Sequence, residues 1–384
     1  MLEYLKIYKP TGIRLVYGNK QYVWDDNGKR YLDYHTGFGV AFLGHRPRRV
    51  VERLKRQLER LMVATPSFEN DVRDEMLNLL GKIIPQRYRY IVLQNSGTEA
   101  VEVALKIARK ATGRSKIVSF IGSFHGRTYG SLSVTWNPNY REPFKPLLPN
   151  VTFLPWNKIE HLERGIDEDT AAVILELIQG EGGVNPASLE FVKALYDEVK
   201  RKNCLLIVDE VQTGFGRTGS IWAFQQYNVE PDIFTAGKAI GGGFPVGLVV
   251  VRDGLGDVLK PGEHGSTFGG NPLACAAIVG SIETLLEDDV ADKARVKGER
   301  LRRLLEEELG ELRIVRRVKG LGLMLGVELR KQPISVILEL QKLGLLASKA
   351  GATTVRLLPP YLISDDDISW SIEVLKNAIS KCYS

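Results

Sequence analysis

Cysteine is scarce in this 384-residue sequence, and its placement excludes several kinds of site. Cys204, Cys275 and Cys382 are far apart, odd in number and without a CxxC pair. They are typical of reduced thiols in a reducing compartment, and they predict neither a disulfide framework nor a zinc site. None of the five histidines has metal-ligand spacing to another ligand, so we expect no metal.

Long apolar runs are also absent. No stretch is long enough to span a bilayer, and residues 1–7 lack the apolar core of a signal peptide. The net charge of +6, from 52 Lys and Arg against 46 Asp and Glu, is spread along the chain. This modest excess does not indicate nucleic-acid binding, but it permits a basic patch that attracts an acidic partner. We expect a soluble, cytoplasmic protein that binds neither nucleic acid nor membranes.

Apolar strands that alternate with helices occupy the middle of the chain. Strands are predicted over 91–93, 116–121, 171–178, 205–208 and 246–251, with helices over 48–62, 71–84, 99–111 and 189–202. This pattern is typical of a parallel sheet covered on both faces, which binds ligands at the carboxyl ends of its strands. We therefore predict an α/β fold with an N-terminal segment (1–45) that packs with a small α+β C-terminal domain (271–384), and a large domain (46–270).

Lys238 lies in a run of small residues, 235–247, that includes three consecutive glycines. A lysine that forms a Schiff base must be unprotonated part of the time and accessible to a flat aldehyde. The small neighbours leave room for a ring, and apolar Ala236, Ala239 and Ile240 are expected to lower the lysine pKa by desolvation. Taken alone, the run is more typical of a glycine-rich loop with a solvated lysine, because most lysines lie on the surface.

Asp209 directly follows the apolar strand predicted over 205–208. A carboxylate there can pair with a pyridinium nitrogen and keep it protonated. The pattern also fits a Walker B strand, but the sequence lacks the GxxxxGK[ST] motif that a P-loop ATPase needs. Residues 214–219 match GxGxxG, yet they neither follow a strand directly nor open a helix, so we interpret them as a loop and not as a dinucleotide site.

Two further groups follow predicted strands. Ser96, Gly97 and Thr98 precede a helix, where free amides and hydroxyls suit a phosphate, although helix capping is the commoner explanation of such a tripeptide alone. Phe124 can stack on a flat ring and Arg127 can bind a carboxylate. A core phenylalanine beside a surface arginine is the alternative.

Charged and hydroxyl side chains at three later positions complete the candidates. Glu181 places an acid in the flexible loop 180–183 at another strand end. Ser266 and Thr267 belong to the glycine and hydroxyl run 265–272, which can bind phosphate. Arg356 is a charge inside an apolar strand, so it needs a partner, either a ligand carboxylate or Glu181.

Together these segments resemble the class III, ornithine/acetylornithine-type aminotransferases that use pyridoxal phosphate. The resemblance covers nearly the whole chain and rests on six motifs in the family's order: residues 95–100, 124–128, 179–183, 209–214, 237–238 and 265–267. Leu177 departs from the proline that the family commonly has. The resemblance implies the aspartate-aminotransferase-like type I fold and an ω-aminotransferase. A non-enzymatic glycine-rich binding protein, which would carry no such cofactor, is the alternative.

The resemblance also implies how the cofactor is held. Lys238 would bind it covalently and later move the proton, Asp209 would pair with the pyridine nitrogen, and Gln212 would contact the ring hydroxyl. Phe124 would stack on the ring. The phosphate would be bound by Gly97, Thr98 and Thr267, the last from the other subunit of a homodimer.

The resemblance implies one pocket for two substrates. Arg127 would bind the distal carboxylate of the substrate, with Ser266 nearby. Arg356 would hold the α-carboxylate of glutamate, and would pair with Glu181 when the substrate presents only a terminal amine.

Within the family, residues 32–37, 65–68, 133–137 and 350–356 are most similar to archaeal and thermophile members of lysine and arginine biosynthesis. Those members act on substrates linked to a small acidic amino-group carrier protein, LysW. We therefore expect transfer between glutamate/2-oxoglutarate and carrier-linked aminoadipate semialdehyde, with the equivalent ornithine step as a second activity. N-acetylornithine, free-ornithine and GABA aminotransferases share nearly all the motifs, and aminomutases share the fold, so these stay as alternatives.

Overall fold

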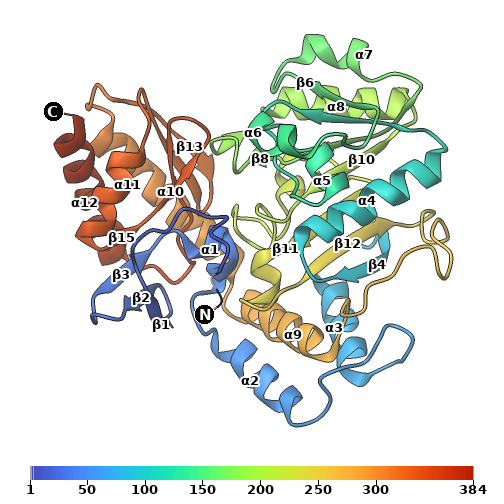
Figure 1. Ribbon diagram of the computed structural model, residues 1–384, viewed down its shortest axis with the longest axis horizontal. Helices are drawn as coiled ribbons and strands as arrows, with labels where there is room; N and C mark the ends of the chain where they lie inside the picture. The colour runs from blue at the N-terminus through green and yellow to red at the C-terminus, as the bar shows by residue number, and fades with distance from the viewer. Residues whose placement is uncertain (1, 3, 384) are drawn as a thin grey trace.

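The computed structural model describes residues 2 and 4–383 and has two lobes (Figure 1). The larger lobe is built on a seven-stranded sheet, and the smaller lobe brings the two ends of the sequence together, with the N-terminal strands beside the C-terminal helices. No helix within the described part of the chain combines the length and apolar sequence needed to cross a bilayer.

The central sheet has the strand order β4-β12-β11-β10-β7-β5-β6. All its neighbouring pairs are parallel except those of β12, which runs antiparallel to both β11 and β4. The expected, mainly parallel sheet is thus confirmed, and β12 is its antiparallel strand. The reason is the short connection from β11, since a parallel return needs a crossover of about a dozen residues or more. The strands are β4 (Tyr88–Gln94), β5 (Lys116–Phe120), β6 (Val151–Leu154), β7 (Thr170–Leu175), β10 (Leu205–Asp209), β11 (Ile233–Gly237) and β12 (Gly247–Arg252).

Helices cover both faces of this sheet, because successive side chains of each buried strand point to opposite faces. Ile207 and Ile233 pack in the cluster that contains α4 (Gly97–Thr112), whereas Val208 and Phe234 pack in the cluster that contains α8 (Leu189–Arg201). The remaining long helices of this lobe are α2 (Arg48–Leu58), α3 (Asp71–Ile83) and α9 (Pro272–Glu287).

The smaller lobe contains two four-stranded sheets. One has the order β1-β2-β3-β15, so a strand from residue 345 onward joins the N-terminal strands, and the other has the order β13-β14-β17-β16. Their elements are β1 (Leu15–Asn19), β2 (Tyr22–Asp25), β3 (Arg30–Asp33), β13 (Val315–Leu321), β14 (Met324–Leu329), β15 (Leu345–Leu346), β16 (Ser348–Ala350), β17 (Thr354–Leu357), α10 (Val290–Leu309), α11 (Ile334–Leu343) and α12 (Asp365–Tyr383).

Two predicted elements end earlier than expected. The helix predicted to residue 62 ends at Leu58, because the chain turns and the Gln57 side chain donates to the carbonyl of Leu61. The strand predicted to residue 178 ends at Leu175, where Glu176 turns to bind backbone amides of two neighbouring loops. The short elements are α1 (Thr36–Gly39), η1 (Val40–Leu43), α5 (Tyr129–Ser133), α6 (Pro138–Arg141), η2 (Glu142–Phe144), η3 (Ile159–His161), α7 (Leu162–Gly165), β8 (Ile178–Gln179), β9 (Asn185–Pro186), η4 (Ala223–Tyr227) and η5 (Lys238–Gly241).

Candidate active site

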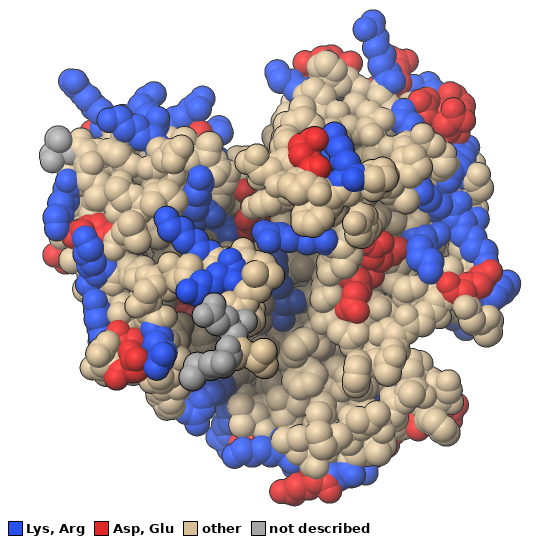
Figure 2. Space-filling model, in the orientation of Figure 1, with Lys and Arg blue, Asp and Glu red and all other residues tan. Residues whose placement is uncertain are grey.

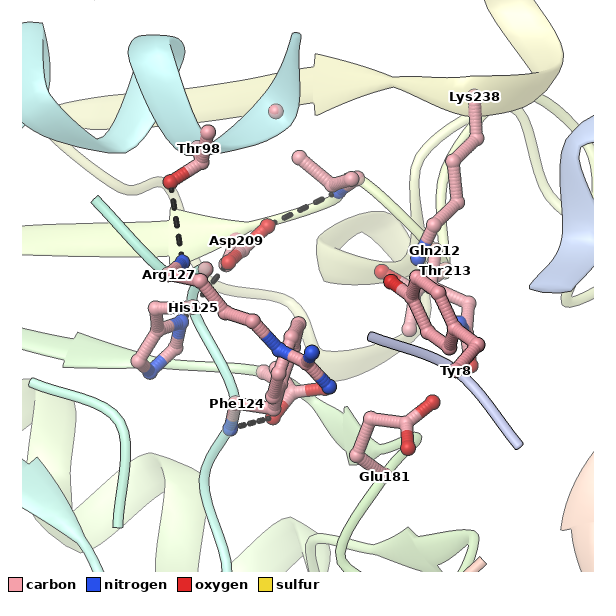
Figure 3. Close-up of a pocket in the computed structure, with 14 residues that line it drawn as sticks. Tyr8, Thr98, Phe124, His125, Arg127, Glu181, Asp209, Gln212, Thr213 and Lys238 are labelled. Carbon is pink, nitrogen blue, oxygen red and sulfur yellow. Dashed lines mark hydrogen bonds and ion pairs between the residues drawn. The ribbon is translucent and has the colours of Figure 1, made fainter. Parts of the chain in front are cut away.

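A cavity of about 310 Å³ lies where the carboxyl ends of β4, β5, β10 and β11 meet. The surface is hollowed between the two lobes, and Lys and Arg side chains lie around the hollow (Figure 2). The side chains that line the cavity converge from several loops (Figure 3). The lining residues are Tyr8, Gly97, Thr98, Phe124, His125, Gly126, Arg127, Glu176, Glu181, Asp209, Val211, Gln212, Thr213 and Lys238.

Lys238 begins the 3-10 helix η5 directly after β11, and its side chain points into the cavity (Figure 3). Its backbone has φ of 49°, a left-handed conformation that is uncommon for a residue with a side chain. Burial lowers the pKa of its amine, although the charge of Glu181 partly opposes this shift. A neutral amine is the form that attacks an aldehyde, so the site favours the reactive form.

Asp209 ends β10 and is held by three hydrogen bonds. Its Oδ2 accepts from Nδ1 of His125 at 2.8 Å, and its Oδ1 accepts from the Thr235 hydroxyl at 3.0 Å and the Val211 amide at 3.1 Å. The His125 side chain is fully buried, and its Nε2 atom has no hydrogen-bond partner among the described residues. His125 follows Phe124 in the sequence, and its separation of 84 residues from Asp209 kept the contact between them from being predicted.

Glu176 is a buried carboxyl that the sequence argument did not single out. It accepts from the amide of Phe124 at 2.9 Å and from the amide of Gly180 at 3.0 Å, so it connects two loops that border the cavity. Burial raises the pKa of Glu176 to about 7, and the charge of Asp209 adds to this rise. Its charge inside the apolar strand predicted over 171–178 was the available signal.

The N-terminus of α4 opens toward the cavity. Ser96 caps the helix, since its hydroxyl accepts from the Glu99 amide at 3.4 Å, as the simple capping explanation requires. Gly97 must be glycine, because a Cβ there would lie 2.6 Å from a methyl of Val211. The Thr98 hydroxyl lies 2.6 Å from that of Ser131. Free amides and hydroxyls at a helix N-terminus suit a phosphate.

Arg127 lies among aromatic rings. Its guanidinium carbon is 4.5 Å from the ring centre of Tyr140, 5.6 Å from Tyr8 and 5.9 Å from Phe124. Within the described residues it makes no ion pair with a carboxylate. The contacts of Tyr8 and Tyr140 with Arg127 were not predicted from the sequence, because neither tyrosine belongs to a motif. An arginine held by rings and free of acids can bind a ligand carboxylate.

Arg356 and Glu181 form an ion pair, with 2.6 Å between Nη1 and Oε1. The Arg356 side chain is completely buried, and its Nε donates to the Ser348 hydroxyl at 3.1 Å. Gln212 faces the same guanidinium, at 3.5 Å from its Oε1 to Nη1, and donates to the carbonyl of Phe38. The structure thus pairs the buried Arg356 with Glu181, which is one of the two partners expected from the sequence.

Ser266 and Thr267 do not line the cavity of their own chain. The Ser266 hydroxyl accepts from the Asn95 side chain at 2.9 Å, and Thr267 is exposed. Within one chain these two residues are therefore apart from the other candidate site residues.

Residues 7–379 match the family model described as aminotransferase class-III. The chain belongs to the class III aminotransferases. It is 51% identical over 378 residues to a protein of Sulfurisphaera tokodaii named [LysW]-aminoadipate semialdehyde/glutamate semialdehyde transaminase, with 98% of this chain and 97% of the relative covered. It is 41% identical over 378 residues to an acetylornithine aminotransferase of Methanopyrus kandleri, with 98% and 96% covered.

Solved class III structures share this fold. An ornithine aminotransferase of Toxoplasma gondii, in which pyridoxal phosphate partly occupies the active site, is 34% identical. The superposed part spans 98% of this chain and 91% of the Toxoplasma gondii chain, with a TM-score of 0.94. These comparisons confirm the predicted type I fold, the family and the cofactor, pyridoxal phosphate.

The cavity of this aminotransferase fits its cofactor. Gly97 and Val211 both line the cavity, and only a glycine lets the N-terminus of α4 come this close to Val211, because a Cβ at position 97 would lie 2.6 Å from a Val211 methyl. The buried carboxylate of Asp209 also lines the cavity and is a suitable partner for a cationic ring nitrogen. When bound, pyridoxal phosphate accepts an amino group and withdraws electrons from the carbon that carried it. The protein supplies a buried lysine whose amine pKa is lowered, a carboxylate fixed by hydrogen bonds, and two arginines, Arg127 and the buried Arg356.

Proposed function

We propose that this aminotransferase moves an amino group between glutamate/2-oxoglutarate and the terminal semialdehyde or amine of a carrier-linked precursor. The carrier is a small acidic amino-group carrier protein, and the precursors belong to lysine biosynthesis and, for the ornithine step, to arginine biosynthesis. The observation that carries the proposal is the 51% identity over nearly the whole chain to relatives from Sulfurisphaera tokodaii and Sulfolobus acidocaldarius that are named for LysW-linked semialdehydes.

In this proposal, Lys238 binds the cofactor covalently and moves the proton at the substrate carbon. Its lowered amine pKa supports both tasks, since a neutral amine can accept that proton. Asp209, fixed by His125, holds a positive charge on the ring nitrogen. Phe124 stacks on the ring and Gln212 contacts its hydroxyl, while Gly97 and Thr98 bind the phosphate at the N-terminus of α4.

The two arginines give the two half-reactions different partners. Arg127 binds the distal carboxylate of the carrier-linked substrate, with Ser266 nearby. Arg356 binds the α-carboxylate of glutamate, which displaces Glu181, and it returns to Glu181 when the substrate presents only an amine. The 2.6 Å contact between Arg356 and Glu181 supports the second state.

A homodimer completes the proposed site, with Thr267 of one subunit reaching the phosphate in the other. The exposure of Thr267 on its own chain supports this arrangement. We would co-express Lys238→Ala and Thr267→Asp chains, each inactive as a homodimer. Random pairing should then restore about a quarter of wild-type activity, because half of the dimers carry one intact site. Failure of the mixture to regain activity would contradict the shared site.

The substrate is tested through the visible absorbance of the bound cofactor. Glutamate, N-acetylornithine, free ornithine, GABA and the carrier protein bearing a C-terminal lysine are added separately to the holoenzyme. Bleaching by glutamate, and far more readily by the carrier-linked donor than by N-acetylornithine, is the expected result. A preference for N-acetylornithine would instead favour the acetylornithine aminotransferase activity named for the Methanopyrus kandleri relative.

A further inference from the structure

A second cavity, of about 420 Å³, opens beside the active-site cavity. Phe124 and Glu181 line both cavities, so the two cavities adjoin at these side chains. The second cavity lies between segment 136–140 of the large domain and the residues Lys349, Gly351 and Ala352 of the small lobe. Phe124, Glu181 and Gly182 of its lining belong to the family motifs, whereas Tyr140 and Lys349 lie outside them.

Arg127 stands at the junction of the two cavities. Its guanidinium stacks 4.5 Å from the ring of Tyr140, which lines the second cavity, and 5.9 Å from that of Phe124, which lines both. Tyr140 and Phe124 meet edge to face, with ring centres 6.2 Å apart. A substrate carboxylate bound at Arg127 would therefore lie close to Tyr140 and Phe124, two side chains that line the second cavity.

The second cavity presents one basic side chain. Lys349 belongs to β16, where its neighbour Ser348 faces Arg356 and the lysine itself points the other way. It forms no ion pair with any carboxylate of residues 2 and 4–383. Glu181, the one acid in the lining, is already paired with Arg356. The cavity thus offers an unpaired cation to a ligand.

We propose that the second cavity is the subsite for the acyl group on the α-nitrogen of the substrate, and that Lys349 makes it prefer an acyl chain with its own carboxylate. The proposal rests on the proposed function, in which that nitrogen is blocked by an amide. The ligand class is an N-acylated ω-amino acid whose acyl chain continues past Tyr140 and bears a negative charge. An acidic carrier attached through such a chain fits the same path.

Two small amino donors test whether the positive charge of Lys349 recognises a carboxylate on the acyl chain. N-succinylornithine and N-acetylornithine differ by one carboxylate at the end of the acyl chain, so the ratio of their KM values reports on that group. Lys349→Gln should raise the KM for N-succinylornithine relative to N-acetylornithine about fivefold, the size of an exposed ion pair. Lys82→Gln, which removes an exposed lysine of α3 outside both cavities, is the matched control and should leave the ratio unchanged. An unchanged ratio in Lys349→Gln would overturn the role of Lys349.

A second variant tests whether the acyl chain occupies the second cavity. Ala352→Phe fills part of the second cavity and should raise the KM for N-succinylornithine more than that for N-acetylornithine. The glutamate half-reaction, measured in each preparation, reports whether the variant is folded and loaded with cofactor. Equal effects on both acylated donors would refute the subsite. A carrier-linked donor without any advantage over N-acetylornithine would refute the proposed function, yet an acyl preference that depends on Lys349 would still support the subsite.

Discussion

Replacing Glu181 with glutamine should separate the two half-reactions. The change removes the carboxylate that lies 2.6 Å from Nη1 of Arg356 and keeps the shape of the side chain. When an ω-amine occupies the pocket, the buried Arg356 guanidinium is then left without an anionic partner. When glutamate occupies the pocket, its own carboxylate supplies that partner.

The structure sets the size of the effect. Arg356 is completely buried, and its Nη2 has no hydrogen-bond partner among the described residues, so little else compensates its charge. Removing one member of a buried pair costs about 3–5 kcal/mol, but Glu181 is 28% exposed, and water offsets part of that cost. We therefore expect a loss of about 2 kcal/mol, or roughly thirtyfold in kcat/KM, for the ω-amine half-reaction. The glutamate half-reaction should change by less than about threefold.

Single-turnover bleaching of the cofactor measures each half-reaction separately. The wild type, Glu181→Gln and the exposed control Glu160→Gln are mixed with glutamate and with the ω-amine donor, and the apparent second-order rates are compared. Among the residues that the structure describes, Glu160 forms an ion pair only with Lys158, at 4.0 Å, and it lies outside both cavities. Equal losses on both sides in Glu181→Gln would refute the alternation of Arg356 between two partners.

Three further predictions concern the lysine, a buried acid and a buried arginine. Lys238→Ala should lower transamination more than about a hundredfold and alter the visible absorbance of the bound cofactor, as measured by steady-state assay and spectrum. Burial raises the pKa of Glu210 from the usual 4.5 to about 7, so the folded state binds the extra proton and stability falls as pH rises between these values. Glu210→Gln should remove up to about 3 kcal/mol of that fall, seen by urea unfolding at pH 5 and pH 8, and an unchanged difference would contradict the assignment. Arg217 donates to the carbonyls of Gly39, Leu323 and Pro359, so Arg217→Met should cost about 3 kcal/mol in urea unfolding, whereas the exposed Arg295→Met should cost almost nothing.

Much of the fold could be predicted because its signals are local. Runs such as 205–208 are apolar throughout, and helices such as α4 carry a cap and an apolar stripe. The antiparallel direction of β12 was not predicted, because an apolar strand has the same residue pattern whether it runs parallel or antiparallel to its neighbours. Only the short connection that begins at Lys238 determines its direction. The ends of α2 and β7 escaped too, because the side chains of Gln57 and Glu176 that end them bind distant or irregular backbone.

The loop 214–219 shows how a local motif can mislead. Its GxGxxG pattern is shared with dinucleotide sites, but in the fold it carries Arg217, a buried arginine that contacts three distant segments. Burial lowers the pKa of Arg217 to about 9, and carbonyl oxygens, not carboxylates, hold its guanidinium. The arginine thus joins the N-terminal segment at Gly39, the turn that precedes β14 at Leu323, and the C-terminal part at Pro359, a role that no short motif describes.

The sequence by itself determined which chemical groups stand at the strand ends, because residue type, glycine placement and the order of strand, turn and helix are local properties. It was enough to predict the family, its fold and its cofactor. Only the tertiary structure decided which groups touch. Asp209 contacts His125 across 84 residues, and Arg127 packs against the rings of Tyr8 and Tyr140, of which Tyr140 lines a second cavity. Such contacts depend on the order of strands in the sheet and on how the small lobe closes over it, and these arise from packing of the whole chain.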